Sequence, residues 1–554
     1  MRLALEDAGR RTAAQKKHME KLLPAPVGGW SSNSSIAKEN PGAAEVLENF
    51  IPTTRGVRAR GGSVVYASVG IAPVLTLMTY EGGASDEMFA VSGGGIYDVT
   101  AIADPLLIPT AVSSGLTNNE LSYVNYSIAG TNYLVAFNGA DLHRVYDGAT
   151  WATNTPAITG VSSASINQAW IHGNRMWMVE AGTKTAWYLS VDSIGGAANS
   201  FSPFQKGGNL LFGATWSQDS GSGSADRCVF VSTNGEVAVY YGENPGAAAT
   251  WQLFGRYDVA PPLGRYAFQK VGGDLLIMTV SGIVSMSEVV SKDPAALTAT
   301  AITKFIEPDW KKATDTYADK NWRFLKWDAA NIGVVAVPST IEQQTAPAAW
   351  GSTFIWGVTE WGEDVTIDVL LKTPRCFVVN LQTGRWSLVT GWDCRSMTVF
   401  NGKFYFGTSV GRVVQGDEGG NDMGASYICK LAYWPSRFDH LGEKQFLQAA
   451  AVFEHSTTFI PKVSMSTNNV ISWPSAPVFP PEDNASGTWD SGVWDGAVFD
   501  AVGEKRVSYE RWVSINKRGR VGALMLQLSF NNTTTPVVEF TDAIVTYEKA
   551  AVVT

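Results

Sequence analysis

Apolar and polar residues alternate along most of this chain with a period of two, which is the pattern of half-buried β-strands. Residues 396–417, SMTVFNGKFYFGTSVGRVVQGD, show it most clearly, with alternating positions on both sides of Asn401-Gly402. Asn-Gly is typical of a hairpin turn, because both central residues of a type I′ turn need a positive φ. A second turn at 409–411 precedes Val413-Val414, so this stretch predicts a small antiparallel meander.

The same pattern recurs upstream in segments 88–99, 123–146, 168–189, 227–241, 268–286 and 322–337. The spacing is about 45 to 55 residues, as expected when each repeat is one sheet of about four strands. A single meander cannot bury both faces of its sheet, so several must pack around an axis. We therefore predict an all-β chain with a β-propeller over residues 63–425, of about seven units, with six and eight as alternatives. The last unit, 396–417, should be completed by an early strand near 64–68, which would close the ring.

Two further regions flank the predicted propeller. Residues 1–62 form an N-terminal arm and connector, with a helix expected at 1–24 and a short helix at 42–50. Residues 426–554 contain longer alternating segments, at 445–455, 459–465, 511–515, 524–530 and 537–547. These segments predict a C-terminal β-sandwich.

An insertion at 338–373 interrupts the propeller repeats and is rich in aromatic residues, namely Trp350, Phe354, Trp356 and Trp361. Two interpretations stay open. The insertion is either a packed hairpin, or its aromatic side chains form a contact or gating surface at a tip.

A second aromatic loop, TWDSGVWDGAVFD at 488–500, repeats an aromatic-Asp pair every five residues. This period fits neither a helix nor a strand. We expect each aromatic residue to anchor a loop while the Asp caps a turn, in the pairs Trp489-Asp490, Trp494-Asp495 and Phe499-Asp500.

Charge is unevenly distributed along the chain. Residues 1–60 hold ten Lys and Arg against six Asp and Glu, a net charge of +4. Because the whole chain has a net charge of −9, the remaining residues carry −13. An acidic body argues against wrapping nucleic acid by phosphate neutralisation.

No apolar run is long enough for a transmembrane helix, and neither membrane spanning nor secretion is expected. The four cysteines show no CxxC spacing, so buried free thiols are expected.

Catalytic and metal-binding motifs are weak throughout. The five histidines lack HxxxH or HExxH spacing, and no GxSxG or Walker-type motif occurs. Residues 217–221 match only the first part of a sialidase-type Asp-box, and carboxylates such as Glu360, Glu363 and Asp364 are neighbours of the kind that chance produces. We expect no enzyme activity, no cofactor, and no catalytic or metal-binding residues.

Several loose motifs are similar to tail nozzle proteins of short-tailed (podovirus-type) bacteriophages, also called tail hub or tail tubular protein B-like proteins. They comprise Gly28-Gly29, Asn40-Pro41, Ala43-Ala44, Leu47, Asn49-Phe50-Ile51-Pro52, Arg58-Ala59-Arg60-Gly61, 380–386 (NLQTGRW), Phe406-Gly407, Gly411-Arg412-Val413, Asp417 and the WD-rich loop at 488–500. The resemblance implies a hexameric ring below an adaptor ring. Each subunit would combine a propeller with a platform built from both chain ends.

The expected function is therefore a structural nozzle or hub ring in the virion tail, assembled in the host cytoplasm, that retains and then releases the DNA genome during ejection. Expected partners are copies of the chain, the adaptor ring, other tail proteins such as fibres or spikes, and double-stranded DNA that passes without specific binding. The channel wall should carry more Asp and Glu than Lys and Arg, with the basic residues of the first 60 turned toward partner proteins. Candidate assembly contacts are Trp30, Asn49, Phe50, Arg58 and Arg60. The alternative is a carbohydrate-binding or carbohydrate-cleaving propeller at the tail tip, which clustered Trp beside convergent carboxylates would favour.

Overall fold

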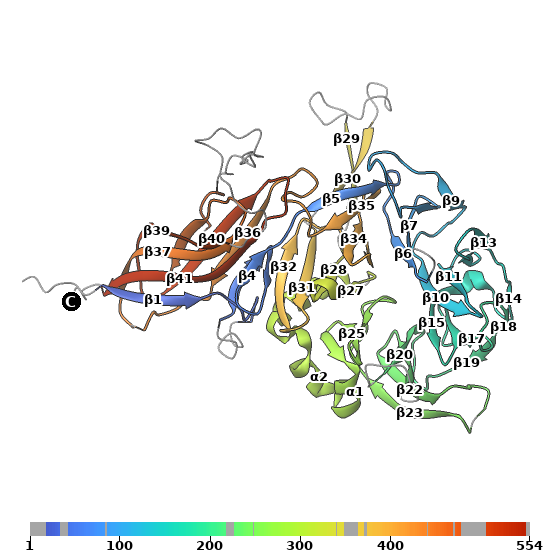
Figure 1. The fold of residues 1–554 in the computed structure, drawn as a ribbon. Coiled ribbons are helices and arrows are strands. Elements are labelled where there is room, and N and C mark those ends of the chain that lie inside the picture. Colours follow the sequence, from blue (N-terminus) through green and yellow to red (C-terminus); the bar gives the residue numbers. More distant parts are fainter. Residues whose placement is uncertain are drawn as a thin grey trace, which may run out of the picture.

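The molecule has two lobes, a ring of small sheets and an elongated β-sandwich that lies beside it (Figure 1). This computed structural model describes residues 18–33, 42–82, 86–217, 226–247, 249–318, 320–338, 341–347, 364–370, 374–439, 441–468, 471, 473–477 and 506–549. For 341–347, 364–370 and 506–510 only the backbone is described. The ring is called the propeller below, and the sandwich is called the platform.

Seven groups of antiparallel strands follow one another around the propeller. Blade 1 contains β6 (Thr76–Tyr80), β7 (Glu87–Ser92), β8 (Gly95–Asp98) and β9 (Ala111–Ser114), and blade 2 contains β10 (Ser122–Ile128), β11 (Thr131–Phe137), β12 (Arg144–Tyr146) and β13 (Trp151–Thr153). Blade 3 contains β15 (Ile166–His172), β16 (Arg175–Glu180), β17 (Ala186–Tyr188) and β19 (Asn199–Phe201), and blade 4 contains β20 (Leu210–Trp216), β21 (Arg227–Ser232), β22 (Glu236–Gly242) and β23 (Trp251–Asp258).

Blade 5 contains β24 (Phe268–Val271), β25 (Asp274–Thr279) and β26 (Gly282–Ser285), and blade 6 contains β27 (Arg323–Trp327), β28 (Ile332–Val337), β31 (Arg375–Asn380) and β32 (Arg385–Thr390). Blade 7 contains β33 (Ser396–Phe400), β34 (Lys403–Gly407), β35 (Arg412–Gly416) and the early strand β5 (Ser63–Ser68). A short parallel pair, β14 (Ile158–Thr159) with β18 (Gly196–Ala197), forms a separate two-stranded sheet. The predicted all-β class and β-propeller are confirmed, and each repeat found in the sequence falls in a different blade.

The ring is closed by strands from distant parts of the chain. β5 pairs antiparallel with β35, with Val65 opposite Val414 and Ser63 opposite Gly416. The predicted closure is confirmed, and it removes the exposed sheet edge that an open ring would leave. The hairpin turn expected at Asn401-Gly402 is also present, with φ angles of 48° and 73°.

The platform is a sandwich of two sheets that contain strands from both ends of the chain. One sheet has the order β3 (Phe50–Pro52), β4 (Val57–Ala59), β41 (Val538–Lys549), β37 (Lys444–His455) and β39 (Arg506–Gly519), with β1 (Met19–Pro24) also paired to β41. In the other sheet, β2 (Ala44–Glu48), β36 (Tyr427–Tyr433), β40 (Gly522–Phe530) and β38 (Lys462–Thr467) continue from β32 of blade 6. One eight-stranded sheet therefore runs from the propeller into the platform.

Two predicted helices are wrong where the structure describes them. Residues Met19–Pro24 form β1 instead of the end of a helix, and 42–50 contain β2 and the start of β3. The reason is tertiary pairing: β1 lies along β41, and β2 lies between β32 and β36. Local propensity is a weak guide where backbone groups find partners on another strand.

Three helices between blades 5 and 6 were not predicted. They are α1 (Met286–Ser291), α2 (Pro294–Thr300) and α3 (Glu307–Tyr317), with 3-10 turns at Ile302–Ile306, Asp328–Ala330 and, in blade 3, Ser163–Ser165. The Ser285 hydroxyl accepts from the Glu288 N–H at the start of α1, and Asp293 caps α2 ahead of Pro294. These capping residues are visible in the sequence and could have indicated the helices.

The two ends of the insertion pair with each other as the strands of one hairpin. β29 (Ile341–Pro347) pairs antiparallel with β30 (Asp364–Leu370), and Figure 1 shows this pair pointing away from the ring. The candidate tip residues Trp350, Phe354, Trp356 and Trp361 lie outside the described residues, as do the loop anchors Trp489, Asp490, Trp494, Asp495, Phe499 and Asp500. Both expectations for these side chains stay predictions.

Candidate functional site

The seam between the two lobes is organised around Arg60, which follows β4 and is fully buried. Its guanidinium uses all five N–H donors. Two go to the Asp422 carboxylate at 2.9 and 2.6 Å, and the Nε–H goes to Oδ1 of Asn49 at 2.8 Å. The other two go to the backbone carbonyls of Gly61 and Thr390, at 2.7 and 2.9 Å. A single side chain therefore connects the N-terminal connector, blade 6 and the loop after blade 7.

Aromatic rings enclose the same guanidinium. The Arg60 Cζ lies 4.1 Å from the ring centroid of Tyr427 and 5.3 Å from that of Trp392. Burial by itself lowers the pKa of Arg60, but the hydrogen bonds and charge of Asp422 more than compensate, so the pKa lies above its usual value. The Tyr427 hydroxyl donates to the carbonyl of Arg60 at 2.6 Å, and burial raises the pKa of this phenol. The Arg60 guanidinium is therefore held in its charged form and is shielded from solvent.

A second ion pair lies next to the first. Arg58 donates to both carboxylate oxygens of Asp417, at 3.2 and 2.7 Å, and the Gly61 N–H donates to the same carboxylate at 2.6 Å. The chain passes so close here that a Cβ added to Gly62 would lie 2.0 Å from the carbonyl oxygen of Asn421. Glycine is therefore required at 62 by close backbone approach.

Asn49 completes the seam at the junction of β2 and β3. It has a φ of 60°, in the left-handed region that Asn tolerates better than most residues. Its side-chain amide donates to the Thr390 hydroxyl at 2.9 Å and to the Ile428 carbonyl at 2.8 Å. Its Oδ1 accepts from Arg60 and from the Thr390 N–H, so Asn49 links the connector to blade 6 and to β36.

The five candidate assembly contacts all lie in or beside this seam. Asn49, Phe50 and Arg60 are at most 1% exposed, and Trp30 is 6% exposed within the shared core. These side chains make their contacts inside the chain, and their role as assembly contacts stays a prediction. Arg58 keeps a partly exposed side chain, but it too is paired within the chain.

The other basic residues of the described N-terminal region are also paired internally. Lys21 contacts Asp439, and Arg55 contacts Glu454 and Glu539. These acids all belong to the C-terminal part of the platform. The basic residues described between 18 and 60 thus attach the connector to the chain's own acidic body. The expectation that they turn toward partner proteins stays a prediction.

A cavity of about 350 Å³ lies on the propeller axis. Its walls come from the innermost strands or preceding loops of six blades, with Thr76, Leu77, Leu121, Ser122, Tyr123, Gln168, Ala169, Arg265, Tyr266, Phe268, Gln269, Arg323, Phe324, Leu325 and Met397 as lining residues. This set, all within the described residues, contains no Trp, Asp or Glu. The cavity lacks the Trp and carboxylate combination that would favour the carbohydrate-cleaving alternative.

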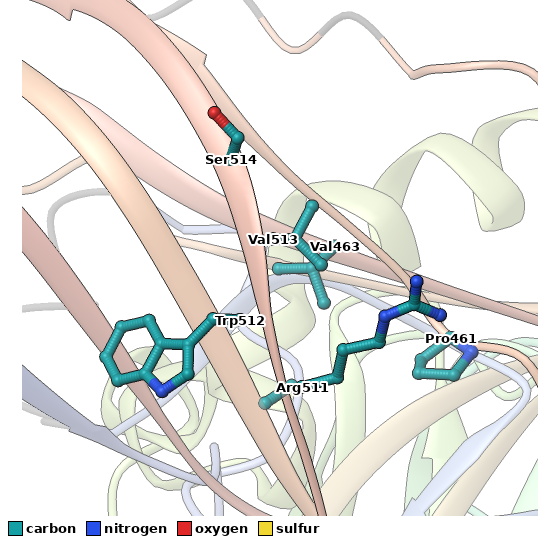
Figure 2. A pocket seen from close by; sticks show the side chains of 7 residues that line it. Pro461, Val463, Arg511, Trp512, Val513 and Ser514 are labelled. Atoms are coloured by element: carbon teal, nitrogen blue, oxygen red, sulfur yellow. The ribbon is translucent and has the colours of Figure 1, made fainter.

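A second cavity, of about 260 Å³, lies at the edge of the platform beside β39. Figure 2 shows the Arg511 and Val513 side chains on the side of β39 that faces Pro461 and Val463, while Trp512 points away from them. Trp512 is 41% exposed. β39 is an edge strand, paired only with β37 among the described residues.

Comparisons with known proteins give likenesses of fold only. No family model matches the chain, and no curated protein matches it. Among solved structures, the WD40 β-propeller domain of Doa1 aligns with 64% of this chain and 97% of its own length, at 9% identity and a TM-score of 0.34. The extracellular domain of a one-component system from B. thetaiotaomicron aligns with 74% of this chain and 44% of its own length, at 10% identity and a TM-score of 0.29.

The described residues contain no cluster of three or more His, Cys, Asp or Glu side chains that could hold a metal ion. Within the same part of the chain, no helix is long and apolar enough to cross a membrane. All four cysteines are free thiols; Cys228, Cys376 and Cys429 are buried as predicted, whereas Cys394 is partly exposed.

Proposed function

We propose that this chain is the subunit of a nozzle or hub ring in a short-tailed phage tail, and that the ring forms the conduit for the genome. The observation that carries the proposal is the way the two lobes are joined. Both chain ends build the platform, and the platform shares an eight-stranded sheet with blade 6. This is the division of labour that the sequence resemblance implies, with a platform for assembly and an attached propeller.

The seam supports a structural role because it makes the two lobes one body. Arg60 and Arg58 each make a two-oxygen contact with an aspartate, and Asn49 and Tyr427 add hydrogen bonds across the same boundary. Fully satisfied buried networks restrict motion between the elements they connect. A subunit of this kind transmits force from one lobe to the other without bending, which suits a part of a tail.

The conduit in this proposal lies between subunits and not along the propeller axis. The axial cavity holds only about 350 Å³ and is crossed by side chains, including Arg265, which contacts Glu120 and the backbone of Asn167. The major groove of B-DNA alone is about 12 Å wide, and the whole duplex is wider still. A duplex therefore does not fit into this cavity. Passage of DNA therefore requires a ring of several copies.

The platform offers the more suitable surface for contacts between copies. The six-stranded platform sheet ends in the edge strand β39, which carries the exposed Trp512. Exposed sheet edges and exposed tryptophans are common in subunit interfaces. We propose that the β39 side of the platform, with Trp512, contacts the next copy in the ring.

The test compares two exposed aromatic residues on the two lobes. Trp512 in the platform is 41% exposed and Tyr241 in blade 4 is 42% exposed, so the two are matched in accessibility. Trp512→Glu should abolish ring formation in native mass spectrometry, while Tyr241→Glu should leave the ring intact. A ring that survives Trp512→Glu, in a variant with an unchanged unfolding midpoint, would exclude this interface.

A further inference from the structure

The axial cavity of the propeller is lined by cationic groups and hydrogen-bond donors, and some of these donors have no acceptor among the described residues. Arg323, in β27, donates one N–H at 2.9 Å to the carbonyl of Leu75, which immediately precedes β6 of blade 1. A guanidinium has five N–H donors. Among the described residues, no Asp or Glu forms an ion pair with Arg323, so no carboxylate in this part of the chain neutralises its charge.

Arg265 approaches the cavity from the loop before β24 and is 8% exposed. Its terminal nitrogens are engaged: one donates to the Asn167 carbonyl at 3.2 Å, and the other to the Glu120 carbonyl and carboxylate, at 2.9 and 3.1 Å. Its Nε–H is buried and has no acceptor on the protein. Glu120 neutralises the charge of Arg265. Among the described residues, no carboxylate does the same for Arg323.

Tyr266 lies between the two guanidinium groups. The Cζ atoms of Arg323 and Arg265 are 4.0 and 4.9 Å from the centroid of its ring. The Tyr266 hydroxyl is buried and has no partner on the protein. The ring fixes the arginines by cation–π contact, and its hydroxyl adds another donor to the group.

Gln168 and Thr76, two further polar residues of the cavity wall, do not accept hydrogen bonds from these donors. Gln168 exchanges two hydrogen bonds with the backbone of Gly213, at 3.1 and 3.2 Å, and its amide is thereby occupied. The Thr76 hydroxyl donates to the Asn119 carbonyl and accepts from the Leu121 N–H. The cavity is thus lined by donors without a carboxylate, which is the composition of an anion site.

From these observations we infer that the axial cavity binds a small molecule bearing a carboxylate or phosphate group, held by Arg323 with Tyr266 beside it. The planar guanidinium matches both groups in a two-point contact. A volume of about 350 Å³ is at the small end of the range for ligand pockets and fits a molecule the size of one sugar. The inference concerns the propeller of a single chain and does not rest on the proposed ring.

The test measures binding to the full-length chain by isothermal titration calorimetry, with inorganic phosphate, glucuronate and glucose as probes at constant ionic strength. Saturable binding of glucuronate with weaker phosphate binding would identify a sugar acid as the ligand class. The opposite order would identify a phosphate ester. Glucose, which has the shape of glucuronate without its charge, should not bind. Equal binding of glucose and glucuronate, or no binding of either anion, would overturn the inference.

Variants separate this cavity from other basic sites. Arg323→Gln should weaken binding of the preferred anion about tenfold or more, since it removes a charge-assisted contact. Arg412→Gln is the control, because Arg412 is an exposed arginine of the propeller that does not line the cavity. If Arg323→Gln does not fold, Tyr266→Phe keeps the ring, removes the hydroxyl and should weaken binding about fivefold. Unchanged affinity in the folded variants would show that the anion binds elsewhere.

Discussion

Arg60 and Asp422 are 362 residues apart in the sequence and form a two-oxygen ion pair, with N–O distances of 2.9 and 2.6 Å. The Arg60 side chain is fully buried, and the Asp422 side chain is 10% exposed. Arg60 follows the connector strand β4, and Asp422 lies in the loop that leads from the last blade to the platform. The pair thus joins the start and the end of the propeller at the point where both meet the platform. This contact therefore helps to hold the propeller and the platform together.

Arg60→Met should lower the free energy of unfolding by about 3–5 kcal/mol, because it leaves the Asp422 carboxylate buried without its cation. Urea unfolding, followed by tryptophan fluorescence, measures the loss. The control is Lys206→Met, which removes an ion pair with Asp258 whose side chains are 63% and 49% exposed. That variant should lose less than about 1 kcal/mol. An equal decrease in the free energy of unfolding in the two variants would show that the Arg60–Asp422 pair contributes no more to stability than an exposed ion pair.

Gly62→Ala should destabilise the chain by about 1–3 kcal/mol, since the added Cβ would meet the Asn421 carbonyl at 2.0 Å and force the backbones apart. Gly207→Ala is the matched control: its φ is not in the left-handed region, and the nearest atom to an added Cβ is at 3.7 Å. Thermal unfolding of both variants gives the comparison. A Gly62→Ala midpoint equal to that of Gly207→Ala would contradict the close approach.

Buried His143 should make stability depend on pH. It is 1% exposed and stacks on Phe137, with centroids 5.5 Å apart, and burial lowers its pKa to about 4. Above pH 6.5 the residue is neutral in both states, so stability is complete there. As pH falls from 6.5 to 4, the unfolded chain takes up a proton that the folded chain does not, and the free energy of unfolding decreases.

The measurement for His143 is the difference in unfolding free energy between pH 7 and pH 4.5. His143→Asn should reduce that difference by about 2–3 kcal/mol, the amount expected for a pKa shift of this size. His172, whose pKa is also lowered by burial, is present in both proteins and contributes equally. An unchanged difference would show that His143 is protonated in the folded chain.

The propeller could be predicted from sequence because its determinants are local. Alternating strands and turns such as Asn401-Gly402 encode each meander, and the repeat spacing indicates how many meanders there are. Even the closure by β5 followed from the principle that a ring leaves no open edge. The residue-level pairing, Val65 opposite Val414, required the structure.

The seam could not be predicted, because its partners are brought together by the fold alone. The sequence analysis names Asn49, Arg58 and Arg60 as candidate assembly contacts, but nothing in the sequence indicates that Asp417 and Asp422 pair with the arginines. For the same reason, Met19–Pro24 was predicted to be helical, although pairing with β41 makes it a strand. The axial arginines were missed as well, since Arg265 and Arg323 come from separate blades and share no motif.

The most direct test of the proposed function is the mass of the assembled species. Native mass spectrometry of the purified chain, alone and after mixing with the tail proteins of the same phage, would show whether it forms a ring. We predict a species at six times the chain mass of 59.6 kDa, alone or within a larger tail complex. A chain that stays at 59.6 kDa under both conditions would contradict the account of a ring subunit.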